Sequence, residues 1–313
     1  MKIAFLADPL SGFKIYKDST YAMMTEAARR GHQVYAFEQQ DMVLESGLVT
    51  ANAAPVALTG DSADWFRLGT YSEMYLSEFD AIVVRKDPPF DMEYIYTTYL
   101  LELAEKQGAR VFNKPSAIRD HNEKLAIAQF SQYTAPTLVT RDAGRLRAFH
   151  TEHKDVILKP LDGMGGAGIF RVREDGMNLG SIIETLTDNG RSTIMVQKFI
   201  PQITEGDKRI LLIGGRVVPF VLARIPQGNE VRGNLAAGGL GVAQSISAAN
   251  LKMAEALAPV LNDRGLLLVG LDAIGDYMTE INVTSPTCFQ EIKQQAGFDV
   301  AEMFITAVEA AVK

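Results

Sequence analysis

The chain has 313 residues, of which 47% are hydrophobic and 22% are charged, and its 31 Lys and Arg against 38 Asp and Glu give a formal charge of −7. This composition excludes a disordered chain, and the length suffices for two or three compact units. The single cysteine, Cys288, excludes an internal disulfide and a cysteine-rich zinc site and is typical of a reducing cytoplasm. We expect no membrane span, because no apolar run approaches about 18 residues, and no nucleic-acid surface, because the chain is acidic.

Residues 1–120 alternate short apolar runs with helical patterns. The apolar runs predict strands at 2–7, 33–37, 80–85 and 110–113. Helices are predicted at 19–30, with Asp18 or Ser19 as the cap, and from Asp91 onward. This alternation is typical of a mostly parallel sheet covered by helices, so we expect an α/β unit. Residues 39–77 have weak periodicity and are expected to form an irregular loop anchored by Trp65.

The rest of the chain is predicted to form two further units, residues 121–200 and 201–313. In the first, a helix at 122–132 precedes strands near 138, 156–159, 169–172 and 193–199. In the second, the runs 208–213 and 216–225 flank Gly214 and Gly215, a dipeptide that a tight hairpin with positive φ accepts. A helix at 248–264, strands at 266–274 and 277–283 and a closing helix from about 301 follow.

A glycine-rich segment, ILKPLDGMGGAGIF at 157–170, is the first candidate site. Lys159 ends an apolar strand, and the loop 161–168 could lay backbone N–H groups against phosphate oxygens. It is not a Walker A loop, because no Gly-Lys-Ser/Thr closes it. It is not a dinucleotide fingerprint either, because a strand and not a helix follows. The alternative is a plain glycine hairpin with a surface lysine.

Oxygen ligands gather on two predicted strands near the C-terminus. Residues two apart on a strand share a face, so Glu280 and Asn282 point the same way, and Asp272 on the preceding strand can lie beside them. Two carboxylates and an amide carbonyl suit Mg²⁺ bound partly through substrate phosphates. The alternative is an ordinary polar strand face.

Positive charge is concentrated in one part of this acidic chain. The segment 198–232 carries +3, which leaves −10 for the other residues, so the overall charge does not exclude an anionic ligand. Each cation taken singly is more often a solvated surface charge, but arginines on both arms of a hairpin could clamp a carboxylate or phosphate. The candidate cations are Lys124, Lys159, Arg209, Arg224 and Arg232.

Residues 227–241 form a candidate lid. Five glycines among fifteen residues leave the backbone little reason to hold one conformation until a ligand orders it. Arg232 and Asn234 lie among these glycines. The alternative is a passive linker.

Together these motifs resemble the ATP-grasp superfamily and, within it, the bacterial glutathione synthetases. The resemblance is carried by RKDPPF at 85–90, LKPLDGMGG at 158–166, ARIPQG at 223–228, RGNLAAGG at 232–239 and TEINVTSPT at 279–287. It covers essentially the whole chain, and the last three segments are far more specific than a lone glycine loop. It implies an ATP-grasp fold, of the α/β and α+β classes, with an N-terminal, mostly parallel α/β domain.

The resemblance also implies a reaction, the ATP-dependent ligation of γ-glutamylcysteine with glycine to form glutathione, ADP and phosphate. The cysteinyl carboxylate attacks the γ-phosphate of ATP, and the glycine amine then opens the acyl phosphate. Mg²⁺ and cations must cancel the repulsion between the two anions. Two Mg²⁺ ions, with Mn²⁺ as an alternative, a homotetramer and a cytoplasmic location are further implications.

The site residues expected from the resemblance fall into four groups. Those for ATP are Lys124, Lys159, Gly163, Gly165 and Gly166 at the phosphates, the backbone of Gln197, Lys198, Phe199 and Ile200 at adenine, and Asp207 at the ribose. Those for transition-state or substrate charge are Arg209, Arg224 and Arg232. Those for the dipeptide and glycine are Lys17, Asp18, Ser19, Arg85, Asn234, Ser285 and Thr287. Those for the metal are Asp272, Glu280 and Asn282.

Two other functions remain open at this point. One keeps ATP-grasp chemistry with another acceptor, as in a glutamate ligase acting on a protein tail or a D-alanine ligase. The other is a nucleotide-binding regulator without turnover, which should have lost a metal ligand or a phosphate lysine.

Overall fold

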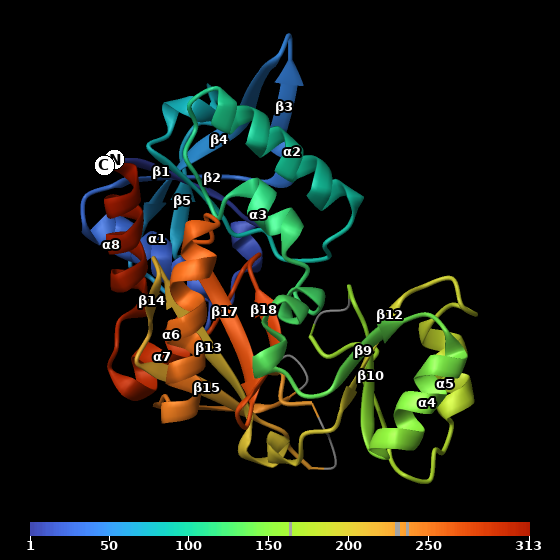
Figure 1. Cartoon of the computed structure of the whole chain (residues 1–313). Helices are drawn as coiled ribbons and strands as arrows, with labels where there is room; N and C mark the ends of the chain where they lie inside the picture. Colours follow the sequence, from blue (N-terminus) through green and yellow to red (C-terminus); the bar gives the residue numbers. More distant parts are fainter. Residues whose placement is uncertain (163–164, 229–231, 236–237) are drawn as a thin grey trace.

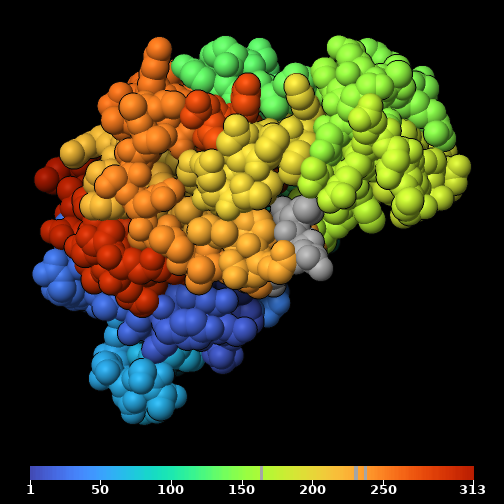
Figure 2. Space-filling model, turned by 90° about the horizontal axis from the view of Figure 1, so that it is seen from below, coloured from blue at the N-terminus to red at the C-terminus, as the bar shows by residue number. Residues whose placement is uncertain are grey.

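A computed structural model describes residues 1–162, 165–228, 232–235 and 238–313, and these form three sheets with helices against them (Figure 1). Seen from below, the yellow-green part of the chain, from about residue 137 to 198, forms a lobe at one side of the molecule (Figure 2). Within the described ranges no helix is long and apolar enough to cross a bilayer.

The first sheet has the predicted parallel centre. Its parallel strands are β1 (Lys2–Leu6), β2 (Gln33–Phe37), β7 (Ala81–Val84) and β8 (Val111–Phe112). The helices are α1 (Ser19–Arg29), α2 (Met92–Lys106) and α3 (Pro115–Asp120), with short 3-10 turns η1 (Leu10–Gly12), η2 (Gln39–Asp41) and η3 (Leu76–Glu78). Asp18 caps α1 by accepting a hydrogen bond from the backbone N–H of Tyr21, and Asp91 caps α2 in the same way, which confirms both predicted helix starts.

The prediction of an irregular loop at residues 39–77 is wrong. This segment adds β3 (Met42–Glu45), β4 (Leu48–Leu58), β5 (Phe66–Leu68) and β6 (Ser72–Tyr75) to the first sheet as antiparallel strands. The hairpin of β3 and β4 projects at the top of Figure 1. The expected anchor is present, since Trp65 is buried and stacks on Phe13 with ring centroids 5.8 Å apart.

The second sheet is antiparallel and has the strand order β11-β10-β12-β9. Its elements are β9 (Thr137–Thr140), α4 (Ala143–His153), β10 (Val156–Pro160), β11 (Phe170–Val172), α5 (Leu179–Leu186) and β12 (Ile194–Lys198). The α-helix predicted at 122–132 is instead a 3-10 segment, η4 (Leu125–Tyr133), interrupted at Phe130. This unit has a small core of its own, lined by Leu146, Leu158 and Ile183 among others.

The third sheet is antiparallel, in the order β16-β15-β13-β17-β18 with β14 beside β13. Its elements are η5 (Pro201–Glu205), β13 (Asp207–Ile213), β14 (Arg216–Val217), β15 (Phe220–Ile225), β16 (Leu240–Ser245), α6 (Ala248–Asp263), β17 (Leu268–Ile274), β18 (Tyr277–Asn282), α7 (Phe289–Ala296) and α8 (Val300–Val312). Gly214 and Gly215 make the predicted tight turn with φ of 55° and 73°.

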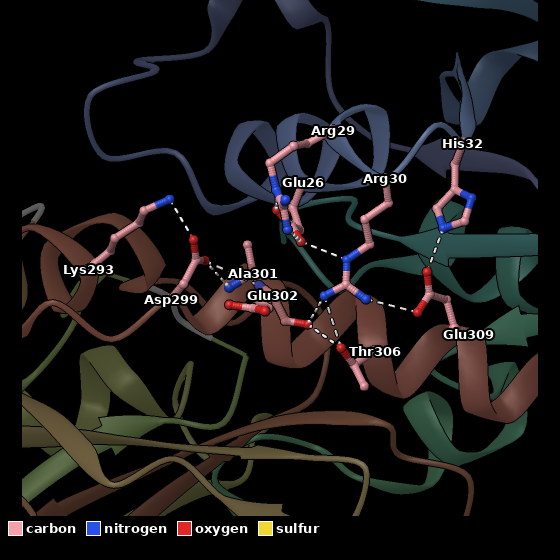
Figure 3. A network of polar contacts seen from close by, with 10 residues as sticks. All are labelled: Glu26, Arg29, Arg30, His32, Lys293, Asp299, Ala301, Glu302, Thr306 and Glu309. Atoms are coloured by element: carbon pink, nitrogen blue, oxygen red, sulfur yellow. Dashed lines mark hydrogen bonds and ion pairs between the residues drawn. The ribbon is translucent and has the colours of Figure 1, made fainter.

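The C-terminal helix α8 returns to the N-terminal unit and packs on α1 (Figure 3). Nη1 of Arg30 lies 2.8 Å from Oε2 of Glu309, and Nε2 of His32 lies 2.8 Å from Oε1 of the same carboxylate. Buried side chains of β1, β13 and α8 belong to one hydrophobic core. The first and third units therefore pack against each other and share a hydrophobic core. The division of the chain at residues 120 and 200 stays a prediction.

Candidate active site

A pocket of about 340 Å³ lies where the second and third sheets meet the loops that follow β7 and β18. Most of the predicted site residues line it: Lys124, Lys159, Gly165, Gly166, Gln197, Lys198, Phe199, Ile200, Asp207, Arg209, Arg224, Arg232, Asn234, Asp272, Glu280, Asn282, Ser285 and Thr287. Gly163 lies outside the described residues. Groups spread over more than 160 positions of sequence thus meet in one cavity.

Strand pairing places the charged side chains of the third sheet next to one another. Asp207 pairs with Arg224 between β13 and β15, and Arg209 pairs with Asp272 between β13 and β17. Asp272 in turn pairs with Glu280 on β18. Since alternate residues of a strand share a face, these five side chains come to the same side of the sheet, as predicted for the carboxylates.

Two arginines neutralise Asp272 in the buried floor of the pocket. Arg209 donates from Nε to Oδ1 at 2.6 Å and from Nη2 to Oδ2 at 3.1 Å, and Nη2 of Arg224 lies 2.9 Å from Oδ2. Although burial opposes ionisation, these two guanidinium groups hold the pKa of Asp272 well below its usual range. The Asp272 carboxylate therefore stays charged.

Asp207 shares Arg224 with Asp272. It accepts a hydrogen bond from Nη2 of Arg224 through Oδ2, but its Oδ1 is buried without a hydrogen-bond partner in the described structure. Burial raises the pKa of Asp207, and the neighbouring carboxylate of Asp272 adds to this, although Arg224 lowers it. An unpartnered buried acceptor that lines a pocket is suited to a ligand hydroxyl.

Two lysines face this floor from the other units. Nζ of Lys124 lies 3.6 Å from Oε1 of Glu280, and Nζ of Lys159 lies 3.4 Å from the carbonyl oxygen of Thr279. Burial lowers the pKa of Lys159. Burial, followed by the charge of Glu280, raises the pKa of Glu123 to about 7. Further negative charge close to Lys159 would favour its charged form.

The predicted metal ligands Asp272, Glu280 and Asn282 line the same pocket from β17 and β18. Asn282 donates from Nδ2 to the carbonyl oxygen of Gly270 at 3.2 Å, so its Oδ1 points away from that carbonyl. No cluster of three His, Cys, Asp or Glu that could hold a metal occurs in the part of the chain that the structure describes. A metal here would accordingly rely on Asp272, Glu280, the Asn282 amide and substrate oxygens, as Mg²⁺ commonly does.

The glycine-rich loop predicted to bind phosphate touches the candidate lid. Gly165 and Gly166 have φ of 63° and 84°, a region that other residues rarely adopt. A Cβ on Gly166 would lie 2.9 Å from Cδ of Arg232 and 2.9 Å from Oδ1 of Asn234. Nη1 of Arg232 lies 3.4 Å from the carbonyl oxygen of Gly166. The two glycine-rich segments singled out in the sequence thus come together over the pocket.

Residues 197–200, predicted to receive adenine, line the pocket, and two of their backbone N–H groups already donate hydrogen bonds within the protein. The N–H of Lys198 donates to the carbonyl of Pro136, and the N–H of Phe199 donates to the carbonyl of Asp155, both at 2.9 Å. The guanidinium of Arg171 stacks 3.5 Å from the ring centroid of Phe199. These contacts tie the end of β12 and Phe199 to the residues just before β9 and β10.

Four of the residues expected for the dipeptide lie beside the pocket and not in its lining: Lys17, Asp18, Ser19 and Arg85. Arg85 is buried and donates from Nε to Oγ1 of Thr20 at 3.0 Å. It adjoins Asp87, a lining residue that accepts a hydrogen bond from Ser285.

Sequence reasoning missed several polar residues of the lining, among them Asp87, Glu123 and Cys288. Asp87 lies in the motif RKDPPF at 85–90, and Glu123 directly precedes Lys124. These predicted neighbours were the sequence features that could have pointed to both residues. Burial raises the pKa of the Cys288 thiol, which therefore stays protonated at neutral pH.

Sequence comparisons agree with this geometry. The model for the N-terminal domain of prokaryotic glutathione synthetase matches residues 1–119, and the model for the ATP-grasp domain of the same family matches residues 123–297. A glutathione synthetase of Ralstonia nicotianae is 67% identical over 99% of this chain and 96% of its own length. One from Bordetella parapertussis is 58% identical over 99% of each chain.

Solved structures support the fold. The ATP-grasp ligase PsnB, complexed with minimal precursor, Mg and ADP, aligns with a TM-score of 0.64 at 18% identity over 99% of this chain and 98% of its own. D-cycloserine synthetase DcsG aligns with a TM-score of 0.67 at 15% identity over 99% of this chain and 100% of its own. The predicted ATP-grasp fold is confirmed, and the chain belongs to the prokaryotic glutathione synthetase family of ATP-grasp ligases.

Proposed function

We propose that this pocket joins γ-glutamylcysteine to glycine at the expense of ATP, through an acyl phosphate of the cysteinyl carboxylate. The observation that carries the proposal is the buried charge constellation of Arg209, Arg224 and Asp272, which faces Lys124 and Lys159 across one cavity. Such a set suits a reaction in which an anionic nucleophile must approach an anionic phosphate.

The roles follow from position. The phosphates are held by Lys124, Lys159, Gly165 and Gly166. Adenine is received by the backbone of residues 197–200. The unpartnered Oδ1 of Asp207 accepts a ribose hydroxyl. Arg209, Arg224 and Arg232 position the carboxylate and stabilise charge that develops on the transferred phosphoryl group.

Asp272, Glu280 and Asn282 hold Mg²⁺, two ions in our proposal, with Mn²⁺ as an alternative. When bound, the metal neutralises phosphate charge during transfer. Arg209 and Arg224 contact the carboxylate oxygens of Asp272. A metal held by the same carboxylate would weaken these contacts and leave both arginines freer to meet the substrate.

The proposed chemistry requires a lid over the pocket. An acyl phosphate exposed to water hydrolyses and wastes ATP, so the segment 227–241 must cover it before glycine attacks. The contact of Arg232 with the phosphate loop at Gly166 supports this role, and Asn234 lies at the same place.

We also propose a homotetramer and a cytoplasmic location, as the family resemblance implies. Ser285 and Thr287, which line the pocket, take part in dipeptide binding in our proposal.

The test is incubation of the protein with ATP, Mg²⁺ and γ-glutamylcysteine, with glycine, D-alanine, glutamate or no acceptor. We expect glutathione and phosphate to form together only with glycine. Efficient ligation of D-alanine or glutamate would favour the ligase with another acceptor. Absence of turnover with every acceptor, despite ATP binding, would favour the regulator.

A further inference from the structure

An arginine outside the pocket lining stacks on one of the aromatic residues that line the pocket. Cζ of Arg171, on β11, lies 3.5 Å from the centroid of the Phe199 ring. This distance is well within the range of a cation held against a ring face. Phe199 follows β12 directly and lines the pocket, whereas Arg171 is not a lining residue. One face of the ring is therefore occupied by a residue that the pocket itself does not expose.

Strand register places Arg171 on the pocket side of the second sheet. Ile157 on β10 pairs with Arg171 on one side and with Gln197 of β12 on the other. Residues directly opposite one another in a sheet share a face, and both Ile157 and Gln197 line the pocket. Since β11 is an edge strand of this sheet, Arg171 stands at the rim of the row that forms the pocket wall.

The guanidinium of Arg171 is fixed by Asp155, the residue before β10. Nε of Arg171 donates to Oδ1 of Asp155 at 2.9 Å, and Nη2 donates to Oδ2 at 2.6 Å. Such a two-point pairing sets the orientation of the guanidinium plane as well as its position.

Asp155 also holds the backbone of the same aromatic residue. The N–H of Phe199 donates to the carbonyl oxygen of Asp155 at 2.9 Å. The contacts thus form a closed circuit from the Asp155 carboxylate through Arg171 to the Phe199 ring, and from the Phe199 backbone back to Asp155. A side chain held at both its backbone and its ring face loses little further freedom when a ligand packs on it.

The surroundings of Phe199 suit a flat, uncharged ring and not a phosphate. The neighbouring residues of the lining include three isoleucines, Ile157, Ile169 and Ile200. The cation Lys159 lies two residues further along β10 than Ile157, about 7 Å away along the strand. The base end and the phosphate end of a nucleotide can therefore be accommodated at successive positions of one strand.

We propose that Arg171 and Asp155 are positioning residues for the adenine base of ATP, which hold the Phe199 ring as a fixed wall for the base to pack against. The inference rests on the proposed function, which places adenine at residues 197–200. Neither Arg171 nor Asp155 contacts ATP in this arrangement, because both act through Phe199. Their loss should weaken ATP binding and leave the chemistry at the phosphate end unchanged.

The first test is Arg171→Met, which keeps the length of the side chain and removes the guanidinium. The Kd of ATP, measured by calorimetry with Mg²⁺, and the KM of ATP should both rise by about 3- to 10-fold. The kcat and the KM values of γ-glutamylcysteine and glycine should stay as in wild type. The side chain of Asp155 is 34% exposed, so water can solvate its carboxylate in the variant. The matched control is Arg191→Met, which removes an exposed arginine that pairs with Asp188 in the same unit.

A double-mutant cycle separates positioning through Phe199 from a general loss of stability. Phe199→Leu removes the ring, so adding Arg171→Met in that background should not raise the Kd of ATP further. Asp155→Asn weakens the pairing with a side chain of the same shape, and it should raise the Kd of ATP in the same direction as Arg171→Met. Thermal unfolding of each variant shows whether the fold is intact.

The results that would contradict the proposal are specific. An unchanged Kd of ATP in folded Arg171→Met protein would overturn it. An equal rise in the Kd of ATP with and without the Phe199 ring would also overturn it, because Arg171 would then act by another route. Wild-type protein that binds ATP but makes no glutathione would overturn the proposed function, and the Kd values of ATP would still decide the role of Arg171.

Discussion

Replacing Glu123 by Gln should make the stability of the protein less dependent on pH. Burial and the charge of Glu280 raise the pKa of Glu123 from 4.5 to about 7. An acid with a raised pKa in the folded state contributes stability below its unfolded pKa, and this contribution is lost as pH rises through its folded pKa. The loss for Glu123 falls between pH 4.5 and about 7.

The size of this effect follows from the two pKa values. A change of one pKa unit corresponds to about 1.4 kcal/mol, so ionised Glu123 should cost about 3 kcal/mol of unfolding free energy once both states have lost the proton. Glu123→Gln removes the titration and keeps the shape of the side chain. As pH rises from about 4 to about 8, the unfolding free energy of the variant should increase by about 3 kcal/mol relative to that of wild type.

Urea unfolding of the metal-free protein across this pH range measures the difference directly. Chelator must be present, because a bound cation would stabilise the Glu123 carboxylate. Glu255→Gln, on the exposed side of α6, is the matched control and should follow wild type at every pH. A difference between Glu123→Gln and wild type that stays constant with pH would refute the assignment of a raised pKa to this carboxyl.

Three further changes test the active site. Arg224→Lys should lower turnover by about 10- to 100-fold with folding intact, because one lysine cannot contact the Asp207 and Asp272 carboxylates together as the guanidinium does. The control Arg216→Lys, on the same hairpin, should have no effect. A fully active Arg224→Lys enzyme would show that Arg224 is not part of the charge constellation. Glu280→Gln should raise the Mg²⁺ concentration needed for half-maximal activity by about 10- to 100-fold, and full activity at limiting Mg²⁺ would contradict the metal assignment. Shortening the segment 227–241 should raise phosphate release relative to glutathione formation, and unchanged coupling would exclude a protective lid.

Local patterns predicted the regular elements well where the signal is short-range. The cap at Asp18 and the glycine turn at Gly214 depend on neighbours in sequence, and the structure has both. The strand β4 was missed because its inward positions are small alanines, such as Ala51 and Ala53, and because Pro55 interrupts it. Its partners β3, β5 and β6 stabilise it through pairings that a local pattern does not contain.

The helix α7 shows a second limit. It begins at Cys288, which has a φ of 88° and gives no capping hydrogen bond, so the usual start signal is absent from the sequence. The place of this helix depends on its packing against α1, α8 and β16, which a local pattern does not contain. Pocket residues embedded in recognisable motifs were predictable, whereas residues placed by packing between distant elements were not.

The central claim is that the pocket activates the cysteinyl carboxylate as an acyl phosphate for attack by glycine. The most direct measurement uses γ-glutamylcysteine whose cysteinyl carboxylate carries heavy oxygen, with ATP, Mg²⁺ and glycine. Attack of the carboxylate on the γ-phosphate predicts that each phosphate released with glutathione carries one labelled oxygen. Glutathione formed with unlabelled phosphate would contradict the account.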